Sequence, residues 1–120
     1  MDMDDAHRLQ HLFQTLGEAN RLKIIKFIGK KERSVSEIVE DIGLSQPLVS
    51  HHLRILRERE ILQTKRNGPF VYYKLKNEKL LDALGLFLEL SRSIKFKIPY
   101  EPMFCCPPRW KTKLQKKQGG

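Results

Sequence analysis

Two adjacent cysteines, Cys105 and Cys106, carry the most distinctive chemistry in this sequence. Their thiolates are soft ligands, which select trivalent arsenic or antimony, copper(I), mercury, cadmium or zinc. Arg109 and nearby lysines should make both thiols easier to deprotonate than isolated ones. A monomethylated trivalent arsenical needs only two sulfur ligands, the number that one chain supplies, whereas inorganic As(III) needs a third. We therefore expect Cys105 and Cys106 to bind a thiophilic ligand, with methylated As(III) favoured among arsenic(III) species.

The cysteine pair is also compatible with other roles. Sb(III), Cu(I), Cd(II) or Zn(II) could replace arsenic, although an S4 zinc or cadmium site would require the tails of two chains to meet. Adjacent cysteines can form a strained, easily reduced disulfide, so a thiol redox switch is a further interpretation. The pair could also have no sensing role. It lies in residues 98–120, a segment rich in proline and lysine that should not form a regular helix.

A second group of residues has the chemistry of DNA recognition. Val49, Leu53 and Leu56 recur at helical spacing and predict one apolar face of a helix. The opposite face carries amide, hydroxyl and guanidinium groups, which read base edges and hold phosphates. The predicted DNA-binding residues of this segment are Ser45, Gln46, Pro47, Ser50, His51, Arg54 and Arg57. The simpler interpretation is the solvated polar face of an ordinary surface helix.

Two short helices joined by a tight turn must position this polar face. Ser34 and Glu37 form the pattern of a capping box at the start of the first helix, and Gly43 suits its left-handed end. Ser45 is a candidate N-cap of the second helix, with Pro47 in its first turn, where the missing N–H breaks no hydrogen bond. This stretch therefore predicts a helix-turn-helix.

Two segments rich in β-forming residues follow the helix-turn-helix. Residues 61–66 and 70–75 predict the strands of a hairpin with a Gly-Pro turn. Lys65 and Arg66 lie near the tip of this hairpin, and we expect both to contact DNA. A basic hairpin that follows a recognition helix is typical of a wing.

Two further helices are predicted before the helix-turn-helix. The first carries an apolar stripe and ends at Gly17, and Asn20 is a plausible N-cap for the second. The second helix carries the apolar residues Leu22, Ile25 and Ile28 and should stop at Gly29. His7 and His11 lie one turn apart on the first helix, but we find no carboxylate or third histidine at a spacing that would complete a metal site with them. We interpret these histidines as surface or interface residues.

A long helix is predicted over residues 78–95. Its leucines and its phenylalanine spread over more than one stripe, which is unusual for the surface helix of a monomer. The excess of apolar surface implies a partner helix, most simply the same helix of a second chain.

Three stretches of the sequence carry a resemblance to a known family. They read ANRLKII at residues 19–25, LSQPLVSHHLRIL at 44–56 and VYYKL at 71–75. The chain resembles the winged helix-turn-helix of ArsR/SmtB metalloregulatory repressors over roughly residues 6–94. The resemblance implies a fold that is mainly α with a small β-hairpin (α+β), and a homodimer through the first and last helices. It also implies binding to double-stranded DNA at a palindromic, inverted-repeat operator, with release when a ligand binds.

Two ligand sites of the resembled family have no counterpart in this sequence. The family's arsenic site places a Cys-x-Cys pattern where this chain has Ser34, Val35 and Ser36. The family's zinc site uses histidines and carboxylates on the last helix, whereas all histidines here precede residue 53. Some family members sense methylated arsenicals through a tail cysteine pair, to which Cys105 and Cys106 are similar.

Length and charge limit the remaining possibilities. A chain of 120 residues supports one domain, which we place at residues 1–97, followed by the tail at 98–120. The net charge of +9 suits a polyanionic partner. Residues 95–120 hold seven Lys and Arg against one Glu, or +6, so the total charge does not locate the DNA site. This excess could equally belong to a solubilising tail.

Several classes of protein are disfavoured by the sequence. We expect no membrane partner and a cytoplasmic location, because there is no long apolar run and the acidic N-terminus is unlike a signal peptide. We expect no enzyme and no permanently bound cofactor, because no phosphate-binding loop or nucleophile–base pattern is present. The remaining rival is a winged helix that binds protein and has no inducer.

Overall fold

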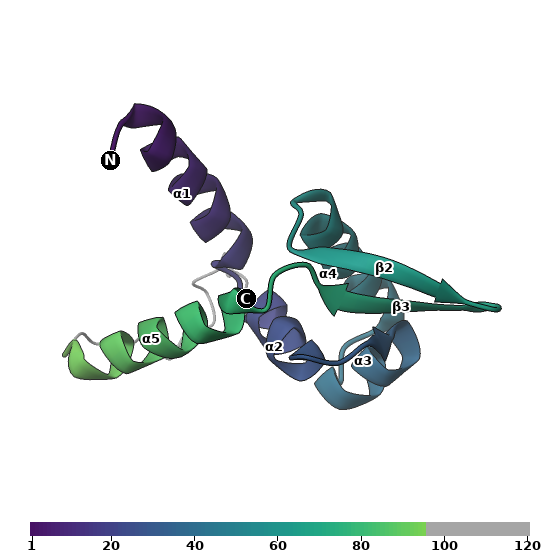
Figure 1. Ribbon diagram of the computed structural model, residues 1–120. Coiled ribbons are helices and arrows are strands. Elements are labelled where there is room, and N and C mark those ends of the chain that lie inside the picture. The colour runs from purple at the N-terminus through teal and green to yellow at the C-terminus, as the bar shows by residue number, and fades with distance from the viewer. Residues whose placement is uncertain (96–120) are drawn as a thin grey trace, which may run out of the picture. The chain divides into compact units, whose positions relative to one another are not determined.

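The computed structural model describes residues 1–95 (Figure 1). Within these residues the helices are α1 (Met3–Leu16), α2 (Ala19–Ile28), α3 (Val35–Ile42), α4 (Gln46–Glu58) and α5 (Lys79–Ser93). The strands are β1 (Arg33–Ser34), β2 (Leu62–Asn67) and β3 (Phe70–Leu75). The predicted fold class, mainly helical with a small antiparallel sheet, is confirmed. Cys105 and Cys106 lie outside the described residues.

The helix-turn-helix forms as the local signals predict. The Ser34 hydroxyl accepts a hydrogen bond from the Glu37 amide at 3.2 Å, and the Ser34 amide donates to the Glu37 carboxylate at 2.9 Å. Gly43 ends α3 in the left-handed conformation with φ 82°. Ser45 caps α4 by accepting from the Leu48 amide at 3.4 Å, with Pro47 in the first turn. These contacts fix the start of α4, whose first residues face solvent.

The sheet contains one strand more than the predicted hairpin. Its order is β1-β3-β2, with both pairs antiparallel. Asn67 pairs with Phe70 across the Gly68-Pro69 turn, and Gly68 adopts φ 65°. The sequence did not predict β1, because a strand of two residues is too short to show an alternating pattern.

The predicted N-cap of α2 is wrong. Its N-cap is Glu18, whose carboxylate accepts hydrogen bonds from the Asn20 amide at 2.6 Å and the Arg21 amide at 3.2 Å. Asn20 therefore lies inside the helix. Among the apolar residues of α2, Leu22 is 37% exposed, whereas Ile24, Ile25 and Ile28 are fully buried. With Glu18 as the N-cap, the Asn20 and Arg21 amides are the second and third of the helix, and the Glu18 carboxylate bonds both, a role that the capping rule gives to shorter polar side chains.

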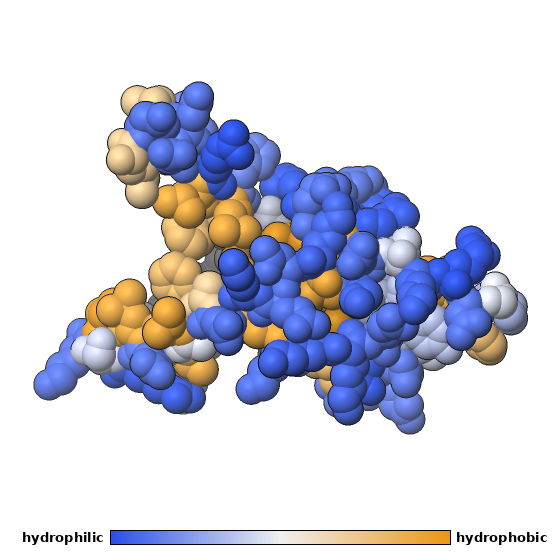
Figure 2. Space-filling view, in the orientation of Figure 1, coloured by the Kyte–Doolittle hydropathy of each residue, from blue (hydrophilic) through white to orange (hydrophobic). Residues whose placement is uncertain are grey.

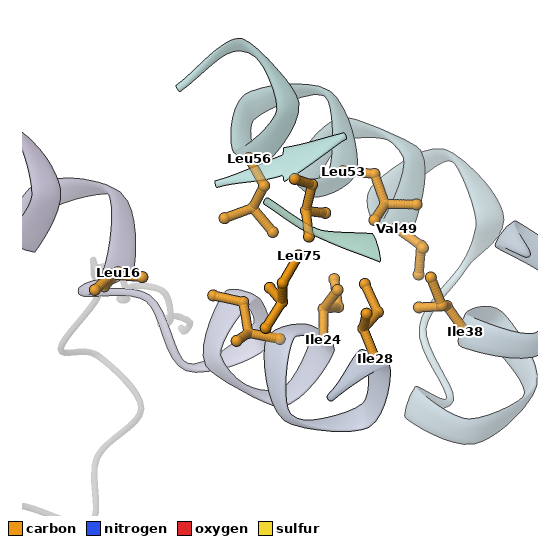
Figure 3. Close-up of a cluster of buried hydrophobic side chains, with 10 residues drawn as sticks. Leu16, Ile24, Ile28, Ile38, Val49, Leu53, Leu56 and Leu75 are labelled. Atoms are coloured by element: carbon orange, nitrogen blue, oxygen red, sulfur yellow. The ribbon is translucent and has the colours of Figure 1, made fainter. Parts of the chain in front are cut away.

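The hydrophobic core joins α2, α3, α4 and the sheet. Figure 3 shows branched side chains from these elements pointing toward one another. The buried residues of this cluster are Leu16, Ile24, Ile25, Ile28, Ile38, Val49, Leu53, Leu56, Leu62 and Leu75. Leu16 comes from the end of α1, so α1 is attached to the core at its C-terminus. Burial of this cluster supplies most of the free energy that holds α4 in place.

The chain divides into two compact units, Met1–Leu86 and Phe87–Gly120. In the first unit, α5 begins by packing Leu80, Leu81 and Leu84 against the core. Of the second unit, the structure describes residues 87–95. None of the described helices is long and apolar enough to cross a membrane.

Candidate nucleic-acid interface

The polar face of α4 is exposed because its opposite face is held in the core. Val49, Leu53 and Leu56 have no exposed surface. All predicted DNA-binding residues of this segment are exposed, namely Ser45, Gln46, Pro47, Ser50, His51, Arg54 and Arg57. The division into a buried stripe and an exposed stripe is what a recognition helix requires, since base edges must be reached without disturbing the core.

Arg54 occupies the middle of the exposed face. One guanidinium nitrogen lies 3.5 Å from Nδ1 of His51, and the other lies 3.9 Å from the Glu58 carboxylate. Both side chains of the Arg54–Glu58 pair are more than half exposed. Such a pair is worth little in water, so Arg54 can exchange Glu58 for a DNA phosphate or a base at small cost.

His52 lies on the buried side of α4 and is only 5% exposed. Its Nδ1 accepts a hydrogen bond from Nε of Arg21 at 3.4 Å. Burial lowers the pKa of His52, and the positive charges of Arg21 and His51 act in the same direction against an opposing effect of Glu18. His52 is therefore a neutral structural residue at pH 7, whereas its neighbour His51 is exposed.

Arg21 links α1, α2 and α4. Besides its bond to His52, it donates from Nη1 to the Thr15 carbonyl at 2.9 Å and, at the longer distance of 3.5 Å, to the Gln14 carbonyl. Arg59 adds a second link between α1 and the end of α4, because it donates to the Thr15 hydroxyl at 3.0 Å. Sequence reasoning missed both the role of His52 and this network. The available signal was the position of His52 on the same stripe as Val49, Leu53 and Leu56.

The wing is the β2–β3 hairpin, and its two predicted basic residues lie on opposite faces. Lys65 is paired with Tyr72 and Arg66 with Val71, and neighbouring residues of a strand point to opposite sides. Arg66 shares the face of Leu62 and Leu75, the face that packs on the core, while Lys65 contacts the Glu32 carboxylate at 3.4 Å. Both basic side chains are exposed, because they lie toward the tip of the hairpin, away from the core. Positive charge is therefore presented on both sides of the wing.

The described residues contain no metal centre. In residues 1–95 no three histidine, cysteine, aspartate or glutamate side chains are arranged to hold an ion. His7 and His11 line an open depression on α1 together with Asp4 and Arg8. This placement agrees with the interpretation of both histidines as surface or interface residues. The predicted ligands Cys105 and Cys106 are outside the described part of the chain.

Comparison with known proteins identifies the family. Residues 18–64 match the family model described as "Bacterial regulatory protein, arsR family". The transcriptional repressor SdpR of Bacillus subtilis is 30% identical over 80 residues, which cover 67% of this chain and 89% of that protein. The chain belongs to the ArsR family. The match includes α2, α3 and α4, the elements that build and support the exposed face described above.

One further relative of this ArsR-family chain and one solved structure of similar fold are informative. The cadmium resistance transcriptional regulatory protein CadC of Listeria innocua is 30% identical over 91 residues, which cover 75% of this chain and 76% of CadC. The homodimeric winged helix-turn-helix DNA-binding domain Mb0332 of Mycobacterium bovis has a TM-score of 0.68 at 19% identity. That comparison covers 84% of this chain and 96% of the Mb0332 domain, and it confirms the winged-helix fold.

Proposed function

We propose that this ArsR-family protein is a DNA-binding transcriptional repressor. It binds an inverted-repeat operator as a homodimer and leaves the DNA when a thiophilic ligand binds Cys105 and Cys106. The observation that carries the DNA-binding part is the exposed face of α4, with Gln46, Ser50 and Arg54 set on a helix whose other side is buried. SdpR, to which the chain is similar, is named as a transcriptional repressor.

In this proposal α4 enters the major groove. Its 13 residues span about 20 Å, and a groove of the duplex accommodates a helix of that length. The first turn of α4, which carries Gln46 and Ser50, contacts base edges, because the N-terminal residues of a recognition helix lie deepest in the groove. Arg54 and Arg57 follow on the same face and contact phosphates or bases. Lys65 and Arg66 of the wing add contacts to the DNA backbone.

The proposed dimer accounts for large apolar side chains that stay partly exposed in a single chain. On α5, large hydrophobic residues are between 47% and 67% exposed, and these are Leu86, Phe87, Leu88, Leu90 and Ile94. Phe13 of α1 is 45% exposed. Figure 2 shows such orange side chains over both helices. Exposed apolar surface of this kind is typical of a protein–protein interface, and Mb0332 is described as homodimeric. A two-fold dimer implies half-sites about one helical turn apart.

The proposed inducer is a soft ligand of Cys105 and Cys106. The name of CadC refers to cadmium resistance, which supports a metal-type inducer for this chain without choosing the ion. We favour a trivalent arsenical, in particular a methylated one, because two thiolates satisfy it. Antimony(III), copper(I), cadmium, zinc and oxidation of the two thiols are the alternatives that the experiment below separates.

The test is a DNA-release assay by fluorescence anisotropy, with the full-length protein bound to a labelled fragment of its own promoter. Binding should be saturable and should weaken steeply as salt rises, because phosphate contacts release counterions. Methylated As(III), arsenite, antimonite, cadmium, zinc, copper(I) and an oxidant are then added separately. Cys105→Ser should bind DNA normally and respond to none of the effective ligands. A response that survives in Cys105→Ser and in Cys106→Ser places the sensor elsewhere, and failure to bind the fragment at low salt refutes the repressor proposal.

A further inference from the structure

A small cavity lies between α1, the end of α4 and the start of β2, within the Met1–Leu86 unit. Its volume is about 160 Å³, and its lining residues are Arg8, His11, Leu12, Thr15, Arg59 and Ile61. None of these residues belongs to the predicted DNA-contacting face. The cavity is thus a separate feature of the molecule, placed where α1 meets the residue that ends the recognition helix.

The charge of this cavity is positive and is not neutralised from within the described chain. Arg8 and Arg59 contribute two guanidinium groups, His11 adds an imidazole, and no lining residue is acidic. The two carboxylates next to Arg59 in sequence are used elsewhere, since Glu58 pairs with Arg54 and Glu60 contacts the Lys76 ammonium at 2.6 Å. Among residues 1–95 neither Arg8 nor Arg59 forms an ion pair. Asp4 is not a lining residue of this cavity, but it lines the open depression on α1 that shares Arg8 and His11 with it.

One of the two guanidinium groups is held in position. Arg59 donates to the Thr15 hydroxyl at 3.0 Å, and that hydroxyl donates to the His11 carbonyl at 2.9 Å. Thr15 is only 2% exposed, and its own carbonyl is occupied by Arg21. The anchor of Arg59 is therefore a buried, fully bonded residue. A guanidinium fixed by one N–H keeps its remaining N–H groups for a ligand and loses little side-chain entropy on binding.

The remaining walls are apolar. Leu12 and Ile61 form these walls, and both side chains also pack against the hydrophobic core. The volume corresponds to about five water molecules at roughly 30 Å³ each. A ligand that matches both the guanidinium groups and the apolar side chains has a planar oxyanion and a hydrocarbon part of a few carbon atoms.

We propose that this cavity binds a small oxyanion, and specifically a short-chain carboxylate. The carboxylate oxygens accept hydrogen bonds from Arg8 and Arg59, and the alkyl group lies against Leu12 and Ile61. On α1, the polar lining residues Arg8 and His11 lie about 140° and 160° around the helix from Phe13, the α1 residue assigned to the proposed dimer face. A ligand here joins α1 to the end of α4 and is positioned to influence DNA binding.

The test is isothermal titration calorimetry of the full-length protein without DNA, in a low-chloride buffer. Three probes separate the contribution of the charged oxyanion from that of the alkyl group. Propionate carries both, inorganic phosphate has an oxyanion without an alkyl group, and propionamide has the shape of propionate without its charge. Arg8→Gln and Arg59→Gln should each raise the Kd of propionate about tenfold or more. The matched control is Arg92→Gln, which removes the same charge from an exposed position on α5 and should leave the Kd nearly unchanged.

The outcomes are distinct. Saturable propionate binding that both cavity variants weaken, with amide shift changes at Thr15 and Ile61 by NMR, supports the proposal. Phosphate that binds as tightly as propionate supports an oxyanion site and removes the contribution of the apolar walls. The proposal is overturned if neither anion gives a saturable signal, if propionamide binds equally well, or if the three arginine variants behave alike. Arg8→Gln keeps this test valid even if Arg59→Gln is destabilised by the loss of its bond to Thr15.

Discussion

Arg21→Met should destabilise the protein even though Arg21 is partly exposed and lies outside the apolar core. The substitution keeps most of the side-chain volume but removes the hydrogen bonds to α1 and α4. The bond to the Thr15 carbonyl, at 2.9 Å, has good length and a charged donor, and is worth about 1.5–3 kcal/mol. The bonds to His52 and to the Gln14 carbonyl, at 3.4 and 3.5 Å, are long and contribute less.

A second contribution to the loss of stability comes from the group left behind. His52 is 5% exposed, so loss of Arg21 leaves its Nδ1 without the partner that it has in the structure. An unsatisfied buried acceptor costs about 1–3 kcal/mol. Since water can reach a half-buried site and replace part of both losses, we expect a total of about 2–4 kcal/mol. The same change should also weaken DNA binding, because α4 loses one of its two links to α1 and keeps only the bond from Arg59 to Thr15.

The assay is urea unfolding at pH 8, followed by circular dichroism, with the midpoint and slope fitted together. The matched control is Arg57→Met, an exposed arginine of α4, which should change the free energy of unfolding by less than about 0.5 kcal/mol. If Arg21→Met and Arg57→Met lie within experimental error of each other, the network through Thr15 and His52 does not support α4 in the way inferred here.

Three further predictions address pH, DNA contact and assembly. As pH decreases, the unfolded chain takes up a proton at His52 near the ordinary pKa of 6.5, before the folded protein does. The free energy of unfolding should therefore fall as pH decreases below about 6.5. His52→Leu should reduce this pH dependence, measured by urea unfolding at several pH values. Arg54→Ala should weaken operator binding by about 1–3 kcal/mol in anisotropy, and an unchanged Kd would remove Arg54 from the interface. Leu90→Asp, at a position 52% exposed on α5, should convert the proposed dimer to a monomer in analytical ultracentrifugation. A Leu90→Asp protein that still sediments as a dimer would exclude this part of α5 from the interface.

The sequence by itself determined the features that depend on neighbouring residues. The capping box of Ser34 and Glu37, the left-handed Gly43, and Pro47 in the first turn of α4 all act within four residues of the chain. The alternating pattern of the hairpin and the exposed face of α4 are equally local, because helix and strand periodicity alone decides which side chains share a face. These signals also carried the family resemblance, which the comparisons confirm.

Only the tertiary structure decided which residues connect these elements. His52 meets Arg21 across 31 positions of sequence, and Arg59 meets Thr15 across 44. Nothing in a local pattern shows such a pair, because an arginine that bonds a distant carbonyl has the same neighbours as one that lies in solvent. The cavity between α1 and the end of α4 has the same origin, since its volume is set by how two separate helices pack. Local sequence therefore determined the exposed polar face of α4, and long-range packing determined the contacts that hold this helix in place.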